Sequence, residues 1–261
     1  MPCHAGVTHF HCLLWLANLV QPCWLNGMEA GKAGKSLNFV RKDTLLPECV
    51  LLVHGLARSN KSMKRMKKSL AKAGYTTLNL NYPSTSKTIE EIAEKFFRPA
   101  VQSCWATGAK QVHCVTHSMG GIVLRYALQQ FPFLKISRVV MLSPPNQGSL
   151  VAEKLKKWWL FQLVNGPAGQ QLGLSKDSLP HQLGPVDAEV GIITGSRHCF
   201  FDHWFASFFA TENDGKVSVS EAQLTGMKDF LVVPEAHPFI MNADSVIQQI
   251  FHFLQYSSFK H

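Results

Sequence analysis

The residue whose surroundings most clearly suggest chemistry is Ser118. An apolar run over residues 112–116 precedes it, and the chain then reads His117-Ser118-Met119-Gly120-Gly121 before a helical pattern. A serine on a tight strand-to-helix turn is lifted out of its sheet, and its crowded backbone requires small neighbours, which the two glycines supply. This context predicts a nucleophile. The usual pattern has glycine two positions before the serine, where this chain has Thr116, so the motif departs from it there.

An acid and a base follow the serine in the chain. Asp214 lies in an Asn-Asp-Gly turn after an apolar run at residues 190–194, and His237 lies in Ala-His-Pro before the last helical pattern. We expect His237 to take the serine proton as a base, and Asp214 to orient its ring and stabilise its charged form. Asp202 and Glu212 remain competing acids.

Acyl transfer also needs donors for an oxyanion. Residues 50–53 form an apolar run that ends in His54-Gly55-Leu56. The backbone N–H groups of Leu56 and Met119 are the candidate oxyanion hole, worth several kcal/mol to a tetrahedral intermediate. We interpret His54 as a structural residue that orients this loop, because the oxyanion element occupies its strand end.

A parallel sheet is the element expected to position these residues. Short apolar runs at residues 49–53, 76–81, 111–116, 138–142, 190–194 and 230–233 alternate with helical patterns at 61–73, 89–105, 120–130 and 244–254. Such alternation predicts a mostly parallel central sheet flanked by helices, with catalytic residues at the carboxyl ends of the strands. Asn242 and Asp244 are candidate caps of the last helix.

Two segments depart from this rhythm. Residues 1–35 form an apolar leader that resembles an export signal, although no Lys or Arg precedes its apolar stretch; an uncleaved leader or a true start at Met28 are the alternatives, and with them a cytoplasmic location. Residues 36–261 form the predicted catalytic domain, with a small helical cap at about 149–184. Trp158 and Trp159 in this cap either contact lipid or the substrate cleft, or pack against the domain.

Composition narrows the function classes. With 46% hydrophobic and 16% charged residues in 261, the chain has enough apolar material for one large core and too little charge for a disordered protein. The formal charge is +9, and residues 58–72 concentrate seven Lys and Arg without an acid. Lys61, Lys64, Lys68 and Lys72 share one helical face, which is either a solvated surface or a contact for anionic membranes. Nucleic-acid binding is not expected, because no aromatic interleaving accompanies these charges.

The seven cysteines contain no C-x-x-C pair and no regular spacing, so they indicate neither a metal site nor a disulfide framework. Cys114, in an apolar run, is interpreted as a buried thiol.

Taken together, the ordered motifs resemble bacterial lipases and esterases of the α/β-hydrolase superfamily, from about residue 49 to the C-terminus. The resemblance includes the His54-Gly55-Leu56, Ser118 and His237 motifs and the run Ser-Pro-Pro-Asn-Gln-Gly-Ser at residues 143–149. It implies the α/β-hydrolase fold, Asp214 as the acid, a cap that begins after residue 148, and ester hydrolysis without a cofactor. A metal-dependent reaction is not expected, because no His/Asp cluster has ligand spacing.

Alternatives remain at this stage. The same Ser-His-Asp arrangement serves acyl transfer to other acceptors and cleavage of amides or thioesters. A non-catalytic lipid-binding module is a further alternative, but it would have no need for all these motifs at once. The favoured interpretation is a serine hydrolase of carboxylic esters, with lipid or acylglycerol-type substrates.

Overall fold

A six-stranded sheet forms the centre of the protein in the computed structural model, which describes residues 47–199 and 206–261. Every pair of neighbouring strands is parallel, and the order is β2-β1-β3-β4-β5-β6. The strands are β1 (Glu48–Val53), β2 (Thr76–Leu80), β3 (Gln111–His117), β4 (Arg138–Leu142), β5 (Glu189–Gly195) and β6 (Asp229–Val233). The predicted parallel sheet is therefore confirmed, with each strand close to its expected position.

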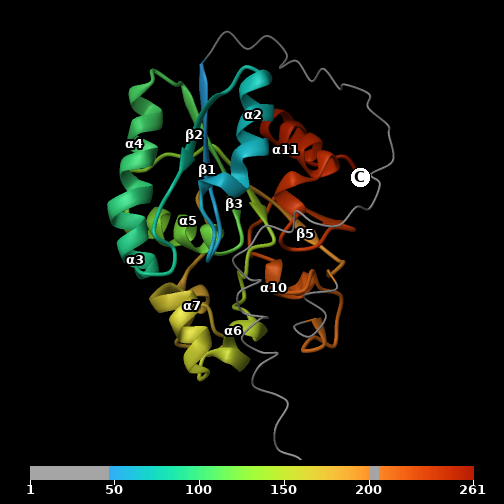
Figure 1. The fold of residues 1–261 in the computed structure, drawn as a ribbon. Helices are drawn as coiled ribbons and strands as arrows, with labels where there is room; N and C mark the ends of the chain where they lie inside the picture. The colour runs from blue at the N-terminus through green and yellow to red at the C-terminus, as the bar shows by residue number, and fades with distance from the viewer. Residues whose placement is uncertain (1–46, 200–205) are drawn as a thin grey trace, which may run out of the picture. The chain divides into compact units, whose positions relative to one another are not determined.

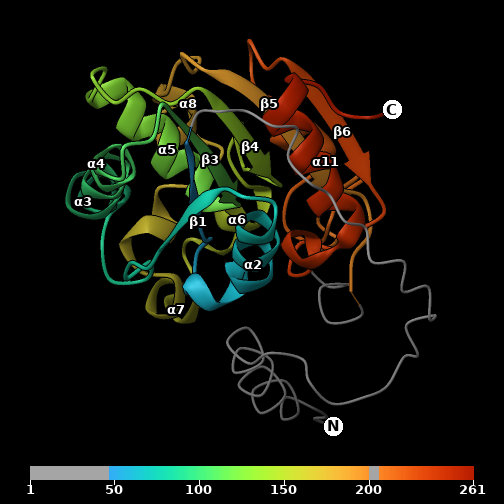
Figure 2. The same cartoon turned by 90° about the horizontal axis from the view of Figure 1, so that it is seen from above.

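Helices cover both faces of this sheet, which explains why the side chains of its central strands are buried along nearly their whole length rather than alternately. Figures 1 and 2 show α2 and α11 on one face and α3, α4 and α5 on the other. Their bounds are α2 (Lys64–Lys72), α3 (Ile89–Ile92), α4 (Arg98–Ala106), α5 (Met119–Gln130) and α11 (Asp244–Tyr256). The apolar residues of β1 are fully buried, so the core lies on both sides of this strand.

The helices follow the predicted patterns with local differences. A 3₁₀ turn (Asn60–Met63) precedes α2, and the buried Met63, Met66 and Leu70 confirm the expected apolar face. The helix expected over 89–105 is α3 and α4 joined by a π-helical turn (Ala93–Phe97). Pro99 follows this turn and has no N–H to continue an α-helical hydrogen-bond ladder, which accounts for the irregularity.

Short helices gather at the carboxyl ends of the strands (Figure 1). Between β4 and β5 lie α6 (Leu150–Leu155), α7 (Trp159–Gln170) and α8 (Leu179–Gln182), within the segment where a cap was expected. The turn α10 (Val219–Ala222) precedes β6, and a 3₁₀ turn (Ile240–Asn242) precedes α11. The expected leader over residues 1–35 lies outside the described residues. In the described part of the chain, no helix has the length and apolarity needed to cross a membrane.

Candidate active site

Ser118 occupies a sharp turn between β3 and α5. Its backbone has φ 53° and ψ −126°, a left-handed conformation that costs a non-glycine residue about 1–3 kcal/mol. Its N–H donates to the carbonyl oxygen of Leu142 at the end of β4, at 2.8 Å. A Cβ atom at Gly120 would lie 2.8 Å from the carbonyl oxygen of His54, so only glycine fits there. The turn therefore presents a partly exposed serine at the carboxyl edge of the sheet.

Asp214 and His237 form a buried pair. Asp214 Oδ2 lies 2.7 Å from His237 Nδ1, and the N–H of His237 donates to the carbonyl oxygen of Asp214 at 3.0 Å. Asp214 Oδ1 accepts from the backbone N–H groups of Lys216 and Val217, at 3.0 and 2.9 Å. These donors fix the carboxylate, and Asp214 has no exposed surface. The competing acid Glu212 is exposed, and Asp202 lies outside the described residues.

His117 connects this pair to the serine. Its Nε2 donates to the carbonyl oxygen of His237 at 3.1 Å, and the two ring centroids are 4.8 Å apart. Burial holds the pKa of His117 well below its ordinary value. His117 therefore stays neutral and keeps its proton on Nε2 as a donor. The residue next to Ser118 thus holds the backbone that carries His237.

The loop after β1 lies against the serine. A Cβ atom at Gly55 would approach Ser118 Cβ to 3.0 Å, so this glycine allows the loop to pass directly beside Ser118. Leu56 follows Gly55 in this loop, and Met119 follows Ser118 as the first residue of α5. Neither backbone N–H donates a hydrogen bond to another described residue, as a role in binding an oxyanion would require.

His54 is buried and holds this loop through contacts with Tyr82 and Gly55. Its ring stacks on that of Tyr82, with centroids 4.0 Å apart and planes 8° from parallel, and the Tyr82 hydroxyl donates to the His54 carbonyl oxygen. Burial lowers the pKa of His54 to about 4, and Nδ1 donates to the Gly55 carbonyl oxygen at 2.9 Å. A neutral, enclosed imidazole agrees with a structural residue rather than a base.

The start of the segment between β4 and β5 is bound to α10, which follows the Asp214 turn. The Glu221 carboxylate accepts from the N–H of Leu150, the first residue of α6, and from the N–H of Ser218, both at 2.8 Å. Burial raises the pKa of Glu221. The buried Arg125 of α5 donates to the carbonyl oxygens of Asn146, just before this segment, and of Leu183, near its end, at 2.9 and 2.6 Å. Both ends of the segment are therefore held to the rest of the domain.

The two halves of α7 differ in their contacts. Gly166 (φ 59°) passes so close to Thr85 that a Cβ atom there would lie 1.7 Å from the Thr85 carbonyl oxygen. Gln171 accepts from the N–H of Ile89 at 2.8 Å, which fixes the end of α7 against α3. In the first half, Trp159 and Leu163 are 68% and 72% exposed, which favours the surface alternative over core packing for this part of the cap.

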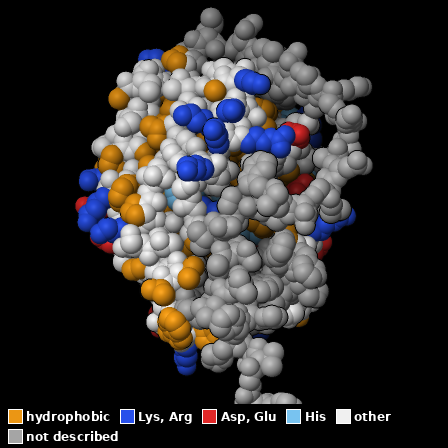
Figure 3. All heavy atoms as spheres, viewed as in Figure 1, with side chains coloured by type: hydrophobic (Ala, Val, Ile, Leu, Met, Phe, Trp, Pro, Cys, Tyr) orange, Lys and Arg blue, Asp and Glu red, His pale blue; other side chains and the backbone are white. Residues whose placement is uncertain are grey.

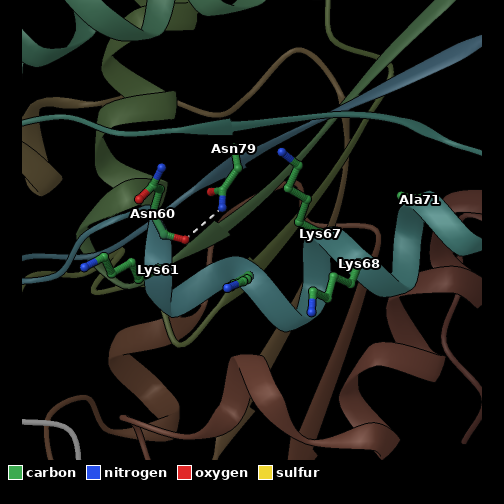
Figure 4. Close-up of a pocket in the computed structure, with 7 residues that line it drawn as sticks. Asn60, Lys61, Lys67, Lys68, Ala71 and Asn79 are labelled. Carbon is green, nitrogen blue, oxygen red and sulfur yellow. Dashed lines mark hydrogen bonds between the residues drawn. The ribbon is translucent and has the colours of Figure 1, made fainter.

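The basic helix face is exposed as expected, and Figure 3 shows Lys and Arg side chains gathered over α2. A groove of about 380 Å³ lies along it (Figure 4). Its lining is Asn60, Lys61, Lys64, Lys67, Lys68, Ala71 and Asn79. In Figure 4 the side chains of Lys61, Lys67 and Lys68 point in different directions, so the groove is a diffuse basic surface rather than a cage around one anion.

Sequence reasoning did not assign roles to Tyr82, His117 and Glu221. His117 lies inside the serine motif, but only the folded chain shows its bond to His237. Tyr82 carried one usable signal, because it follows the carboxyl end of β2, where functional side chains of a parallel sheet gather. Glu221 had none, since its partner Leu150 is 71 residues away.

The parallel sheet and the serine turn at its carboxyl edge are features of one class of protein. Comparison with known protein families identifies the same class. Residues 48–239 match the family model for the alpha/beta hydrolase fold. The chain belongs to this family. No curated protein sequence matches it significantly.

Solved structures show the same fold at low sequence identity. The mature lipase BlEst2 of Bacillus licheniformis is 18% identical, with a TM-score of 0.65 over 83% of this chain and 94% of that one. Phospholipase PlaB of Legionella pneumophila is 19% identical, with a TM-score of 0.65 over 81% of this chain and 60% of that one. A monoacylglycerol lipase of Paleococcus ferrophilus is 16% identical, with a TM-score of 0.53 over 82% and 96%.

Proposed function

We propose that this protein is a serine hydrolase that cleaves carboxylic esters through an acyl-enzyme, with Ser118 as nucleophile, His237 as base and Asp214 as the orienting acid. The observation that carries the proposal is the buried Asp214–His237 pair, at 2.7 Å, linked through His117 to the strained turn that presents Ser118. A partly exposed serine beside such a pair is the arrangement that acyl transfer requires.

In the first half-reaction His237 Nε2 takes the Ser118 proton as Oγ attacks the ester carbonyl carbon. Asp214 accepts from Nδ1, so the neutral ring offers its lone pair at Nε2, and the carboxylate then stabilises the imidazolium. The N–H groups of Leu56 and Met119 stabilise the oxyanion. His237 next gives its proton to the leaving alcohol, and an acyl group remains on Ser118 Oγ.

In the second half-reaction water attacks the acyl carbonyl carbon. His237 takes a proton from this water, the oxyanion forms again between the same two N–H groups, and collapse breaks the bond to Ser118 Oγ. The proton returns to Oγ and the carboxylic acid leaves. No step in this sequence requires a cofactor.

A lipidic, acylglycerol-type substrate is proposed from the cap. Trp158, Trp159 and Leu163 are large apolar side chains with 43%, 68% and 72% of their surface exposed, and they lie on the segment between β4 and β5 that we propose as the cap. Solved structures of this fold include proteins named as lipases and a phospholipase. An apolar surface at this edge suits an acyl chain better than a polar substrate.

Peripheral contact with anionic membranes is proposed from the face of α2. Its exposed lysines diverge along a groove rather than surrounding one point, which suits a layer of many lipid headgroups. Each Lys or Arg near such a surface contributes about 1 kcal/mol, and salt screens the attraction within roughly 10 Å at 0.1 M.

The proposal is tested with Ser118→Ala. Ester turnover should fall by at least about 10⁴-fold and labelling by a fluorophosphonate should disappear, because Oγ is the atom that forms the acyl-enzyme. The matched control is Ser103→Ala, an exposed serine of α4, which should behave as the unsubstituted protein. Labelling that persists at another serine would refute the assignment.

The same preparation separates the alternatives. Comparing ester, thioester and amide substrates, with and without added alcohol, distinguishes hydrolysis from transfer to another acceptor. A lipid-binding module without catalysis would bind lipid equally well before and after Ser118→Ala and would take no label in either form.

A further inference from the structure

Two buried cysteines lie in contact near the amino end of β1, the opposite end of this strand from the proposed active site. Cys49 is the second residue of β1, Cys104 lies in the last turn of α4, and neither side chain has any exposed surface. Their Sγ atoms are 2.7 Å apart. Unbonded carbon atoms rest at about 3.5–4.0 Å, and sulfur is larger than carbon. The structure contains both as free thiols with no S–S bond, but two separate thiols would not rest at this separation.

We propose that Cys49 and Cys104 form a disulfide that joins β1 to α4. In the reaction, the thiolate of one cysteine attacks an external disulfide, either a small-molecule disulfide or that of a thiol oxidoreductase, and releases one thiol. The second cysteine then attacks the mixed disulfide and releases the other. The protein loses two electrons and two protons, and the external disulfide gains them. Because both sulfurs are buried, this exchange takes place before the chain has closed around them.

A third buried thiol, that of Cys114, is an alternative partner for Cys49, and the structure distinguishes between the two. Cys114 lies on β3 opposite Leu51, two positions along the register from Cys49, and is also fully buried. Burial raises the pKa of Cys114 well above its ordinary value. The structure places the Cys104 sulfur against Cys49 rather than against this neighbour. Cys114 is therefore predicted to stay reduced, as the sequence suggested for this residue.

The link would constrain a large part of the chain. Its two ends are 55 residues apart, and the closed loop contains α2, β2, α3 and the His54–Leu56 turn beside Ser118. Closing a loop of this length restricts the unfolded chain, and in a domain of this size the restriction corresponds to a rise in Tm of about 10 °C. Disulfides persist in oxidising compartments, so the link is compatible with the expectation of export.

The direct test is a peptide map of the full chain, produced in a host with an oxidising thiol balance. The protein is unfolded in the presence of N-ethylmaleimide, digested without reductant, and the linked peptides are identified by mass. We expect one peptide pair joined through Cys49 and Cys104, lighter by two hydrogens than the reduced pair, and an alkylated Cys114. Alkylated Cys49 and Cys104, or either of them linked to Cys114, would overturn the proposal.

A second measurement uses matched substitutions. Cys49→Ala, Cys104→Ala and Cys114→Ala each remove one buried sulfur, so their packing losses are comparable. Without reductant, the first two should lower Tm by about 10 °C more than Cys114→Ala. After unfolding and refolding in a phosphine reductant, this difference should vanish. Equal shifts for all three variants without reductant would show that the sulfurs contribute packing alone.

Discussion

Replacing Asp214 with asparagine tests the proposed acid with little change in shape. In the folded protein Oδ1 accepts from two backbone N–H groups, those of Lys216 and Val217, while Oδ2 accepts from His237 Nδ1. An asparagine oxygen satisfies the two backbone donors, and its NH₂ group then faces His237. That group donates to Nδ1, so the ring must carry its proton on Nε2, the atom that has to accept the Ser118 proton.

The magnitude follows from these contacts. Turning the amide over restores the acceptor for Nδ1 but breaks both backbone hydrogen bonds, at about 1 kcal/mol each, so the active orientation falls about 30-fold. Losing the negative charge beside the imidazolium costs about 2 kcal/mol more, another factor of about 30. We expect kcat/KM to fall by about 10³- to 10⁴-fold, in the range known for this change in serine proteases.

The assay is steady-state hydrolysis of a short soluble nitrophenyl ester, with Tm measured on the same samples. Asp214→Asn should keep most of its stability, whereas Asp214→Ala also removes the acceptor for the two backbone donors and should lose more. Glu212→Gln is the matched control, because Glu212 is exposed on the same loop, and it should stay within twofold of the unsubstituted protein. If Asp214→Asn keeps a tenth of the activity, or if Glu212→Gln or Asp202→Asn is the damaging change, Asp214 is not the acid.

Three further predictions concern pH, the cap and the basic face. Burial lowers the pKa of His54 from 6.5 to about 4, so the unfolded chain binds the proton first as pH falls. The stability that the neutral His54 contributes is present above pH 6.5 and is lost between pH 6.5 and 4, by about 2 kcal/mol at pH 5. Burial also holds the pKa of His117 well below its ordinary value, so His117 adds a loss of the same sign, and an unfolding free energy at pH 5 that is not at least about 2 kcal/mol below that at pH 7 in urea melts would contradict this prediction. Trp159→Ala should change the preference among esters of graded acyl-chain length more than it changes Tm. The control Phe133→Ala, which also removes an exposed aromatic side chain, should change neither. A larger effect of Trp159→Ala on Tm than on chain-length preference would show that Trp159 packs against the core. On the α2 face, four lysines are replaced with Gln: Lys61, Lys64, Lys68 and Lys72. This change should weaken sedimentation of the protein with anionic vesicles without changing turnover of a soluble ester, and raised salt should also weaken the sedimentation. Equal binding of the unsubstituted protein to neutral and anionic vesicles would show that this face is only a solvated surface.

Most of the fold could be predicted from the sequence, because the patterns that indicate a parallel sheet are formed by residues close together in the chain. Each strand is a short apolar run, and the helix between two strands shows its own period, so the six strands and the face of α2 were predictable from residue types alone. The turn around Ser118 was predictable for the same reason, since a serine, two glycines and a strand are neighbours in the chain.

Contacts between distant segments were not predictable in this way. Asn242 and Asp244 were expected to cap α11, yet Ala243 occupies the cap position without a side-chain hydrogen bond. Asp244 instead accepts from Arg65, 179 residues away, at 2.6 Å. The spacing of Cys49 and Cys104 in the sequence likewise does not indicate that they meet, because they come together only when β1 and α4 pack in the fold. Sequence patterns show which residue types are available, but the fold decides which ones meet.

The residues that sequence reasoning missed share one kind of contact, which bears on how the proposed enzyme is built. Tyr82 donates to the carbonyl oxygen of His54, His117 donates to that of His237, and Glu221 accepts from the N–H of Leu150 at the start of α6. Each is a side chain that fixes the backbone of another segment. Because the ends of the cap are anchored in this way, the exposed first half of α7 is free to vary without moving the Asp214–His237 pair. In the proposed enzyme we therefore expect substrate preference and catalytic geometry to depend on separate sets of contacts. Substitutions at Trp159 should then leave the ratio of thioester to ester turnover unchanged while they alter chain-length preference.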